Sequence, residues 1–82
     1  MSKSTTESDL EKFYQSIGKN VAKYRQMKDV SQLELAQAIG HKSTTIISLA
    51  EIAKTKRFNL EHLYKIAKYL DVDICDLLES NA

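Results

Sequence analysis

The chain has 82 residues, which is room for one compact domain and no second one. Proline is absent and glycine occurs only twice, which favours helices joined by short connections and excludes a turn-rich β fold. No apolar run approaches the ~20 residues that span a bilayer, and the polar N-terminus holds no signal-peptide core. We therefore expect a soluble, cytoplasmic, all-helical protein.

Cysteine and histidine usage argues against a metal or redox centre. Cys75 is the only cysteine, so neither an internal disulfide nor a cysteine-based metal cage can form. His41 and His62 are the only histidines, and they stand far apart in the sequence without further ligands at suitable spacing. We expect no metal and no cofactor.

The net charge of +1 hides an uneven distribution. Residues 1–70 hold all 12 basic residues and 7 of the 11 acidic ones, whereas residues 71–82 hold 4 acidic residues and no Lys or Arg. This asymmetry predicts one face for a polyanion and an acidic end held away from it.

The first helix is expected from Ser8 to about Lys28, after a disordered segment of residues 1–7, within a single domain of residues 8–80. Ser8 and Glu11 have the spacing of a capping box. Five apolar residues then recur at steps of three and four and define one stripe: Leu10, Phe13, Ile17, Val21 and Tyr24. Gly18 either costs the helix ~1 kcal/mol relative to Ala or lets another helix approach closely.

Two short helices follow the break at Asp29-Val30. Ser31 and Glu34 form a second capping-box pattern. The second helix should bury Leu33 (in part), Leu35, Ala36 and Ile39. Gly40 stands where a left-handed residue ends a helix, and Ser43 can then cap a third helix from Thr44 to about Ile52. The apolar positions of the third helix are Ile46, Ile47, Leu49 and Ala50.

Two more helices complete the expected five. A basic loop of residues 54–57 precedes Asn59, which can cap a fourth helix with Glu61 in its first turn. Its predicted stripe is Leu60, Leu63, Ile66, Ala67 and Leu70. After Asp71-Val72, Asp73 can cap a short last helix that carries Ile74, Leu77 and Leu78.

Residues 32–50 have the pattern of a helix–turn–helix. Two helices this short are unstable alone and persist only when packed against each other. Ala36 allows a close crossing and Gly40 a chain reversal. Such units place their second helix in the major groove of DNA. The alternative for this pattern is an αα-hairpin inside an inert helical bundle. The alternative for the function is a helical protein–protein interaction module that keeps the fold but has lost DNA binding.

Several stretches of this chain resemble the helix–turn–helix domain of the Cro and phage-repressor class, the XRE family. They are Ile17-Gly18, Tyr24-Arg25, residues 30–36 (VSQLELA), Ile39-Gly40, Ile47-Ser48 with Glu51, and the apolar pattern from Leu60 to Leu70. The resemblance covers residues 17–78, and its run SQLELAQAIG is the most specific part. It implies an all-α, five-helix fold like that of the phage lambda repressor and a sequence-specific, double-stranded DNA-binding transcriptional regulator.

The resemblance also implies roles for individual residues. Arg25 and Glu51 match a partly buried ion pair, although an exposed phosphate contact is an alternative for Arg25. The residues matching the base-reading set are Lys42, Thr44, Thr45 and Ser48. Those matching the phosphate-binding set are Gln32, Ser43, Lys54, Lys56 and Arg57. The third helix has no Arg, Asn or Gln, so we expect moderate base readout with a large phosphate and DNA-shape component.

This chain departs from the family pattern in two places. One extra residue follows Gly40, so the third helix has two possible registers. Counted from Gly40, Ile46 and Leu49 face the core, whereas Ile47 and Ala50 do so when counted back from Glu51. We favour a turn lengthened by His41-Lys42. The family favours Gly at the position of Ala53 and Pro in the following loop, so the third helix is expected to continue past Ala53 by a turn.

The C-terminal helices predict a symmetric homodimer on a pseudo-palindromic operator. The predicted interface is Tyr69, Leu70, Ile74, Leu77 and Leu78, although these residues can instead close the core of a single chain.

Stand-alone repressors or autoregulators, restriction–modification controllers and antitoxins all use this domain at this length. No nucleophile–base pair, paired carboxylates or phosphate-binding loop indicates an enzyme.

Overall fold

The computed structural model describes residues 4–80, which hold five α-helices and no strand. The helices are α1 (Glu7–Met27), α2 (Gln32–Ala38), α3 (Thr45–Ile52), α4 (Leu60–Leu70) and α5 (Ile74–Leu78). The predicted all-α, five-helix fold is confirmed. Of the segment expected to be disordered, residues 1–3 lie outside the described residues, and Glu7 already belongs to α1. No helix within residues 4–80 is long and apolar enough to cross a membrane.

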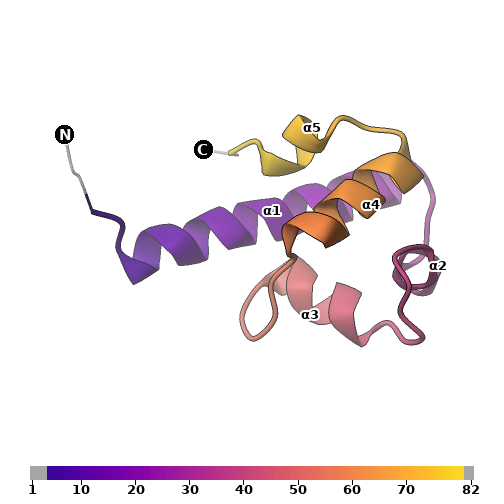
Figure 1. The fold of residues 1–82 in the computed structure, drawn as a ribbon, viewed down its shortest axis with the longest axis horizontal. Helices are drawn as coiled ribbons and strands as arrows, with labels where there is room; N and C mark the ends of the chain where they lie inside the picture. The colour runs from indigo at the N-terminus through magenta and orange to yellow at the C-terminus, as the bar shows by residue number, and fades with distance from the viewer. Residues whose placement is uncertain (1–3, 81–82) are drawn as a thin grey trace.

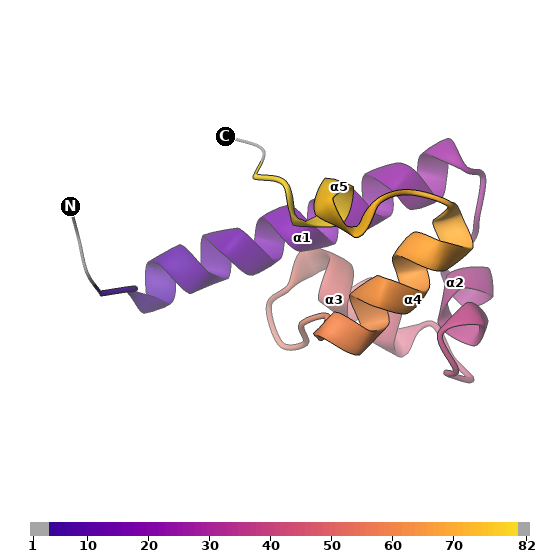
Figure 2. The ribbon, with the colours of Figure 1, turned by 45° about the horizontal axis from the view of Figure 1, so that its top comes forward.

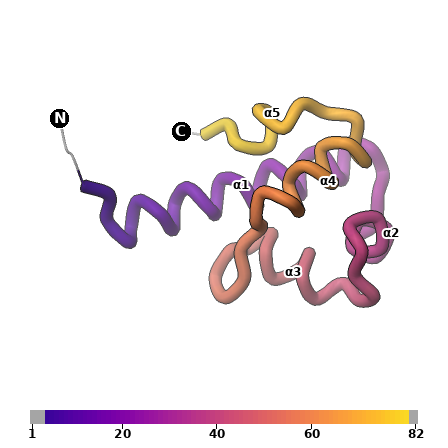
Figure 3. The backbone as a smooth tube through the Cα atoms, viewed as in Figure 1, coloured from indigo at the N-terminus to yellow at the C-terminus, as the bar shows by residue number. Residues whose placement is uncertain are grey.

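The long helix α1 is the spine of the molecule. Figure 1 shows α5 on one side of α1, α3 on the other, α4 crossing in front, and α2 at the end away from the N-terminus. The turned view in Figure 2 shows α4 lying across α3. The molecule measures 41 × 24 × 19 Å, and its length comes from the N-terminal part of α1, which extends beyond the other helices (Figure 3).

The core lies where α1, α3 and α4 meet, with contributions from α2 and α5. Its buried members are Ile17, Val21, Leu35, Ala36, Ile39, Ile47, Ala50, Phe58, Leu63, Ile66, Ala67, Leu70 and Leu77. All but one of these come from the predicted apolar positions. Phe58 was missed because it lies in the loop before α4, where no helical periodicity marks it.

Three predicted core positions lie at the surface. Phe13, Leu33 and Leu60 are 46%, 44% and 72% exposed. Phe13 packs edge-on against Tyr14, with ring centroids 5.5 Å apart, and lines an open groove together with Leu60 and Leu78. Leu33 and Leu60 lie in the first turns of α2 and α4. The spacing of apolar residues identifies the apolar face of a helix, but it does not show which residues of that face a neighbouring helix covers.

Side-chain caps begin four of the five helices. Ser31, Asn59 and Asp73 cap α2, α4 and α5, as predicted. The cap of α1 is Thr6 and not Ser8: the Thr6 hydroxyl accepts from the Asp9 amide at 3.0 Å, and the Asp9 carboxylate accepts from the Thr6 amide at 3.2 Å. Thr6 and Asp9 have the same spacing as Ser8 and Glu11, and a cap at Thr6 lets the helix begin two residues earlier.

Four helices are followed by a left-handed residue. These residues are Asp29, Gly40, Ala53 and Asp71, with φ of 59°, 93°, 53° and 57°. After α2, the Gly40 amide donates to the Gln37 carbonyl oxygen at 3.1 Å and the His41 amide to the Ala36 carbonyl oxygen at 2.9 Å. This is the Schellman arrangement, in which Gly carries no steric penalty. The prediction for Gly40 is confirmed.

The end of α3 differs from the prediction. α3 stops at Ile52, because Ala53 adopts the left-handed conformation with φ 53° and ψ 34°. The expectation that the helix continues past Ala53 is therefore wrong. The conformation costs an alanine ~1–2 kcal/mol, and burial of the Ala53 methyl group, which is 2% exposed as a residue, offsets part of this cost.

A buried polar side chain joins α1 to the C-terminal end of α5. Asn20 is 2% exposed, and its Nδ2 donates to the Leu77 carbonyl oxygen at 3.0 Å and the Glu79 carbonyl oxygen at 2.6 Å. α5 has five residues, so its last carbonyl groups have no partners within the helix. Asn20 supplies those partners and fixes α5 on α1.

Candidate nucleic-acid interface

The Glu51 carboxylate on α3 connects three helices. Arg25 on α1 donates to it from Nε at 2.8 Å and from Nη2 at 3.3 Å, and Gln32 on α2 donates from Nε2 at 3.0 Å. Arg25 also donates from Nη1 to the Val30 carbonyl oxygen at 3.0 Å. The side chains of Arg25 and Glu51 are only 11% and 8% exposed. This network holds α2 and α3 in a fixed arrangement on α1, and it engages the Arg25 guanidinium that was the alternative phosphate ligand.

Gln32 lies at the start of α2, where the resemblance implied a phosphate contact. One of its amide N–H groups is used by the Glu51 carboxylate, and the side chain is half-buried. A primary amide has a second N–H donor. The phosphate contact of Gln32 stays a prediction that relies on this second donor.

The start of α3 lies one residue later than expected. Thr44 is the N-cap residue, with a right-handed helical backbone and no side-chain cap hydrogen bond. Ser43 instead donates its hydroxyl proton to Thr45 Oγ1 at 3.3 Å. The predicted capping role of Ser43 is therefore wrong, because the turn of residues 39–44 brings Thr44 into helical conformation before α3 begins.

The buried face of α3 decides between the two registers. Ile47 and Ala50 are 0% and 1% exposed, whereas Ile46 and Leu49 are only half-buried. This is the register counted back from Glu51, which the longer turn after Gly40 makes possible.

The opposite face of α3, which we call its open face, is exposed at Thr45 and Ile52 and half-buried at Ser48 and Leu49. Its members lie three or four residues apart and are Thr45, Ser48, Leu49 and Ile52. Of the predicted base-reading residues, Thr45 and Ser48 lie on this face, Lys42 is exposed in the preceding turn, and Thr44 is half-buried at the N-cap. Leu49 and Ile52 were missed, although the register counted from Glu51 places them there.

The predicted phosphate-binding residues lie on both sides of this face. Ser43 is exposed before α3, and Lys54, Lys56 and Arg57 are exposed in the loop after it. Arg57 is held toward α1, because its guanidinium carbon lies 4.6 Å from the centroid of the Tyr14 ring. The open face of α3 is therefore bordered by Lys42 in the preceding turn and by the basic side chains of the following loop.

Two side-chain pairs join the helix–turn–helix to α4. The Nε2 atoms of His41, in the turn, and His62, on α4, are 3.4 Å apart. The Tyr69 hydroxyl donates to the Glu34 carboxylate on α2. This hydrogen bond raises the pKa of the Tyr69 hydroxyl above 10.0, because ionisation would remove the proton that Tyr69 donates; burial and the negative charge of Glu34 act in the same direction. Glu34 therefore does not complete the predicted capping box with Ser31.

The residues predicted for a dimer interface divide into three groups. Leu70 and Leu77 are 1% and 0% exposed, so the core of the single chain contains them and they cannot contact a partner. Tyr69 lies on the flank of α4 that faces α2. Only Ile74 and Leu78, both half-buried, remain as the predicted members on the α5 side.

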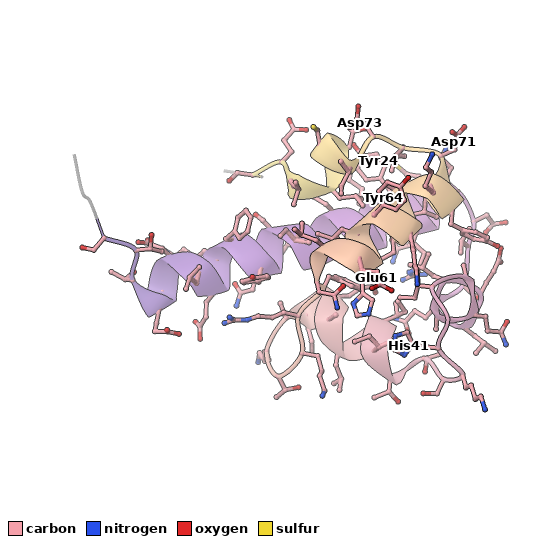
Figure 4. All side chains as sticks on the ribbon, in the orientation of Figure 1. Tyr24, His41, Glu61, Tyr64, Asp71 and Asp73 are labelled. Carbon is pink, nitrogen blue, oxygen red and sulfur yellow. The ribbon has the colours of Figure 1, made fainter. Side chains whose placement is uncertain are left out.

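The acidic end lies away from the helix–turn–helix. Figure 4 shows Asp71 and Asp73 at the top of the molecule, near the start of α5, and His41 at the bottom, on the opposite side. The uneven charge seen in the sequence therefore becomes a separation in space, with the lysines of residues 42–56 on one side and the acidic cluster on the other. Within residues 4–80, no three His, Cys, Asp or Glu side chains gather as a metal-binding group.

These features define the class. Two short helices are joined at a glycine turn. The first is held to the second by Gln32 and Glu51, and the second is fixed on α1 by Arg25 and Glu51 while its other face lies between basic segments. This arrangement is the helix–turn–helix of a DNA-binding protein.

Comparison with known proteins gives the family. Residues 20–82 match the Cro/C1-type HTH DNA-binding domain. The chain belongs to this family, and it is a DNA-binding transcriptional regulator. The fold is similar to the crystal structure of the restriction-modification controller protein C.AhdI from Aeromonas hydrophila, with a TM-score of 0.68, 26% sequence identity, and coverage of 85% of this chain and 97% of that one. No curated protein matches the chain.

Proposed function

We propose that this protein binds a pseudo-palindromic operator as a homodimer and controls transcription as a stand-alone repressor or autoregulator. The open face of α3 between two basic segments is the observation that carries the proposal. The similarity to a restriction-modification controller favours an operon controller over an antitoxin. Since the partner is chromosomal or episomal DNA, the protein acts in the cytoplasm.

In the proposed complex, α3 enters the major groove. Thr45 and Ser48 face base edges, and Lys42 reaches a guanine or a phosphate. Lys54 and Lys56 contact phosphates on one side of the groove, with Ser43 and the second amide N–H of Gln32 on the other. Arg57 joins them when it leaves the Tyr14 ring. The Arg25–Glu51 pair contributes by holding α3 at a fixed angle.

The proposed dimer uses the flank of α4 that faces α5. Leu60 and Tyr64, one helical turn apart, are 72% and 58% exposed, and Figure 4 shows Tyr64 beside α5. Ile74 lines the same groove as Tyr64, and Leu78 lines the same groove as Leu60. Apolar residues gathered in this way indicate an interaction surface. A second copy is the expected occupant, because a pseudo-palindromic site is read by two copies related by a two-fold axis.

The salt dependence of binding tests the docking. Fluorescence anisotropy with a selected duplex should show a steep fall in affinity with salt. Lys42→Ala and Lys56→Ala should each flatten the log–log slope by ~1. Lys19→Ala is the matched control, because Lys19 is exposed on α1 and lines a groove with Ser80, outside both α3 and the proposed dimer surface, and it should leave the slope unchanged. Binding that neither lysine variant alters would refute this docking, and a chain that binds no duplex would be the protein-interaction module.

Sedimentation tests the dimer separately. The native chain should sediment as a dimer at tens of micromolar, and Leu60→Asp should give a monomer that keeps its helical circular dichroism. Met27→Asp is the control, because Met27 is 66% exposed on α1 and should not affect association. A native chain that is monomeric at this concentration would exclude the dimer.

A further inference from the structure

The open face of α3 is poor in free hydrogen-bonding groups. The Ser48 hydroxyl donates to the Thr45 carbonyl oxygen at 3.3 Å, and Thr45 Oγ1 accepts from the Ser43 hydroxyl at 3.3 Å. Each hydroxyl group on this face therefore already makes one hydrogen bond within the chain, which leaves the Thr45 hydroxyl as a donor and the Ser48 oxygen as an acceptor. The other two members of the face, Leu49 and Ile52, present only carbon atoms.

These carbon atoms form a continuous strip. Thr45, Leu49 and Ile52 lie at i, i+4 and i+7, so their side chains are neighbours along one side of the helix. Ile52 is 54% exposed, and no part of the core covers it, because Ile47 and Ala50 occupy the opposite face. The threonine methyl group, the leucine and the isoleucine together make an apolar strip, which we call the methyl strip.

The charges around the methyl strip indicate what covers it. Lys42 precedes it and Lys54 and Lys56 follow it, all three exposed. The only acidic residue between positions 41 and 58 is Glu51, and Arg25 is paired with it. An apolar strip with a basic border fits a polyanion that also carries apolar groups at its surface. In the major groove of DNA, that group is the C5-methyl of thymine.

We propose that α3 selects thymine-rich half-sites by packing the methyl strip of Thr45, Leu49 and Ile52 against thymine methyl groups. The inference rests on the proposed DNA docking of α3 and deepens it by naming the base feature that is read. Hydrogen-bond readout is left to Lys42 at the N-terminal end of the strip and to the one group that Thr45 and Ser48 each keep available, so apolar contacts carry most of the base selectivity of this helix.

Replacing thymine by deoxyuridine tests the proposal directly, because this change removes the methyl group and keeps base pairing. The duplex is one selected from random DNA by the native chain, and thymines are replaced one at a time. At each thymine under the strip, affinity should fall about four-fold, the factor expected for losing the burial of one methyl group. Equal affinity at every position, or a selected half-site without thymine under α3, would overturn the proposal.

The variant Ile52→Ala assigns the effect to the strip. It should bind the thymine duplex about four-fold more weakly, bind the deoxyuridine duplex like the native chain, and lose discrimination at one thymine. The matched control is Met27→Ala, which removes an exposed apolar side chain of α1 that is not part of the methyl strip, and it should keep the full thymine preference. Because Ile52 is exposed, both variants should keep the native melting temperature within a few degrees.

The measurements distinguish a failure of the proposed DNA binding from a failure of the methyl-strip proposal. If the native chain binds no duplex at low salt, the proposed function itself is wrong. If it binds with the predicted salt slope but treats thymine and deoxyuridine alike, only the methyl strip is wrong. If discrimination persists in Ile52→Ala and in Thr45→Ser, other residues read the methyl groups and the assignment to the strip is refuted.

Discussion

Gly18 on α1 lies against the backbone of Glu51 on α3. A Cβ atom placed on Gly18 would be 2.3 Å from the Glu51 carbonyl oxygen and 2.8 Å from the Ala50 carbonyl oxygen. These are backbone atoms that cannot turn aside as a side chain would. Of the two possibilities that the sequence left for Gly18, close approach of another helix is the one observed.

Gly18→Ala should therefore destabilise the protein by about 1–3 kcal/mol, as overpacking typically does, even though alanine is the better helix former. Urea denaturation followed by circular dichroism gives the change in the free energy of unfolding. Lys19→Ala, on the exposed side of the same turn, is the control and should be nearly neutral. A more stable Gly18→Ala variant would mean that α1 and α3 do not approach this closely.

Removing one partner of the Arg25–Glu51 pair should cost about 3 kcal/mol, because the remaining charge is left nearly buried. Arg25→Met and Glu51→Met should each show this loss of unfolding free energy. The double variant should be much less destabilised than the sum of the two, since no charge is then stranded. Strict additivity in this double-mutant cycle would show that the pair is not coupled.

Asn20 should be needed for the attachment of α5. Asn20→Ala removes the donors to the Leu77 and Glu79 carbonyl groups and should cost about 1–3 kcal/mol. Asn20→Asp should cost more, because a carboxylate would face two carbonyl oxygens. Hydrogen exchange should show that amides of α5 lose protection first. Gln26→Ala, at an exposed position of α1, serves as the control. Unchanged protection of α5 in both Asn20 variants would contradict this role.

His62 should make the folded protein less stable in mild acid. Burial, and then the positive charge of His41, lowers the pKa of His62 below its ordinary value of 6.5, with a further lowering by Lys65 and an opposing effect of Glu61. Below pH 6.5 the unfolded chain therefore takes up a proton that the folded chain resists, so the free energy of unfolding falls as the pH drops.

Thermal melts from pH 7.5 to pH 5 measure this dependence. His62→Gln should flatten it, and His41→Gln should flatten it partly, because the burial of His62 remains. The edge-to-face contact of His62 with Phe58 contributes to that burial, so His62→Gln also lowers stability at every pH. The pH slope is therefore the readout. A His62→Gln variant with the native slope would show that another group is responsible.

The sequence by itself determined which segments are helical and where most of them begin and end. Ser31, Asn59 and Asp73 act as caps, and Gly40 ends α2, because these effects depend on hydrogen bonds within a few residues of the chain. The spacing of apolar residues likewise identified most of the core. The family resemblance added Arg25 and Glu51, two side chains from different helices that the structure brings to 2.8 Å.

Only the tertiary structure decided the features that depend on which surfaces meet. Apolar spacing cannot tell that Leu70 and Leu77 are covered by the chain itself while Leu60 and Ile52 are not, because coverage depends on the neighbouring helix. The register of α3 and the left-handed Ala53 also follow from packing, since Ile47, Ala50 and the Glu51 carboxylate must reach α1 together. The face of α3 that we propose for DNA binding is the part of the helix surface that these contacts leave exposed.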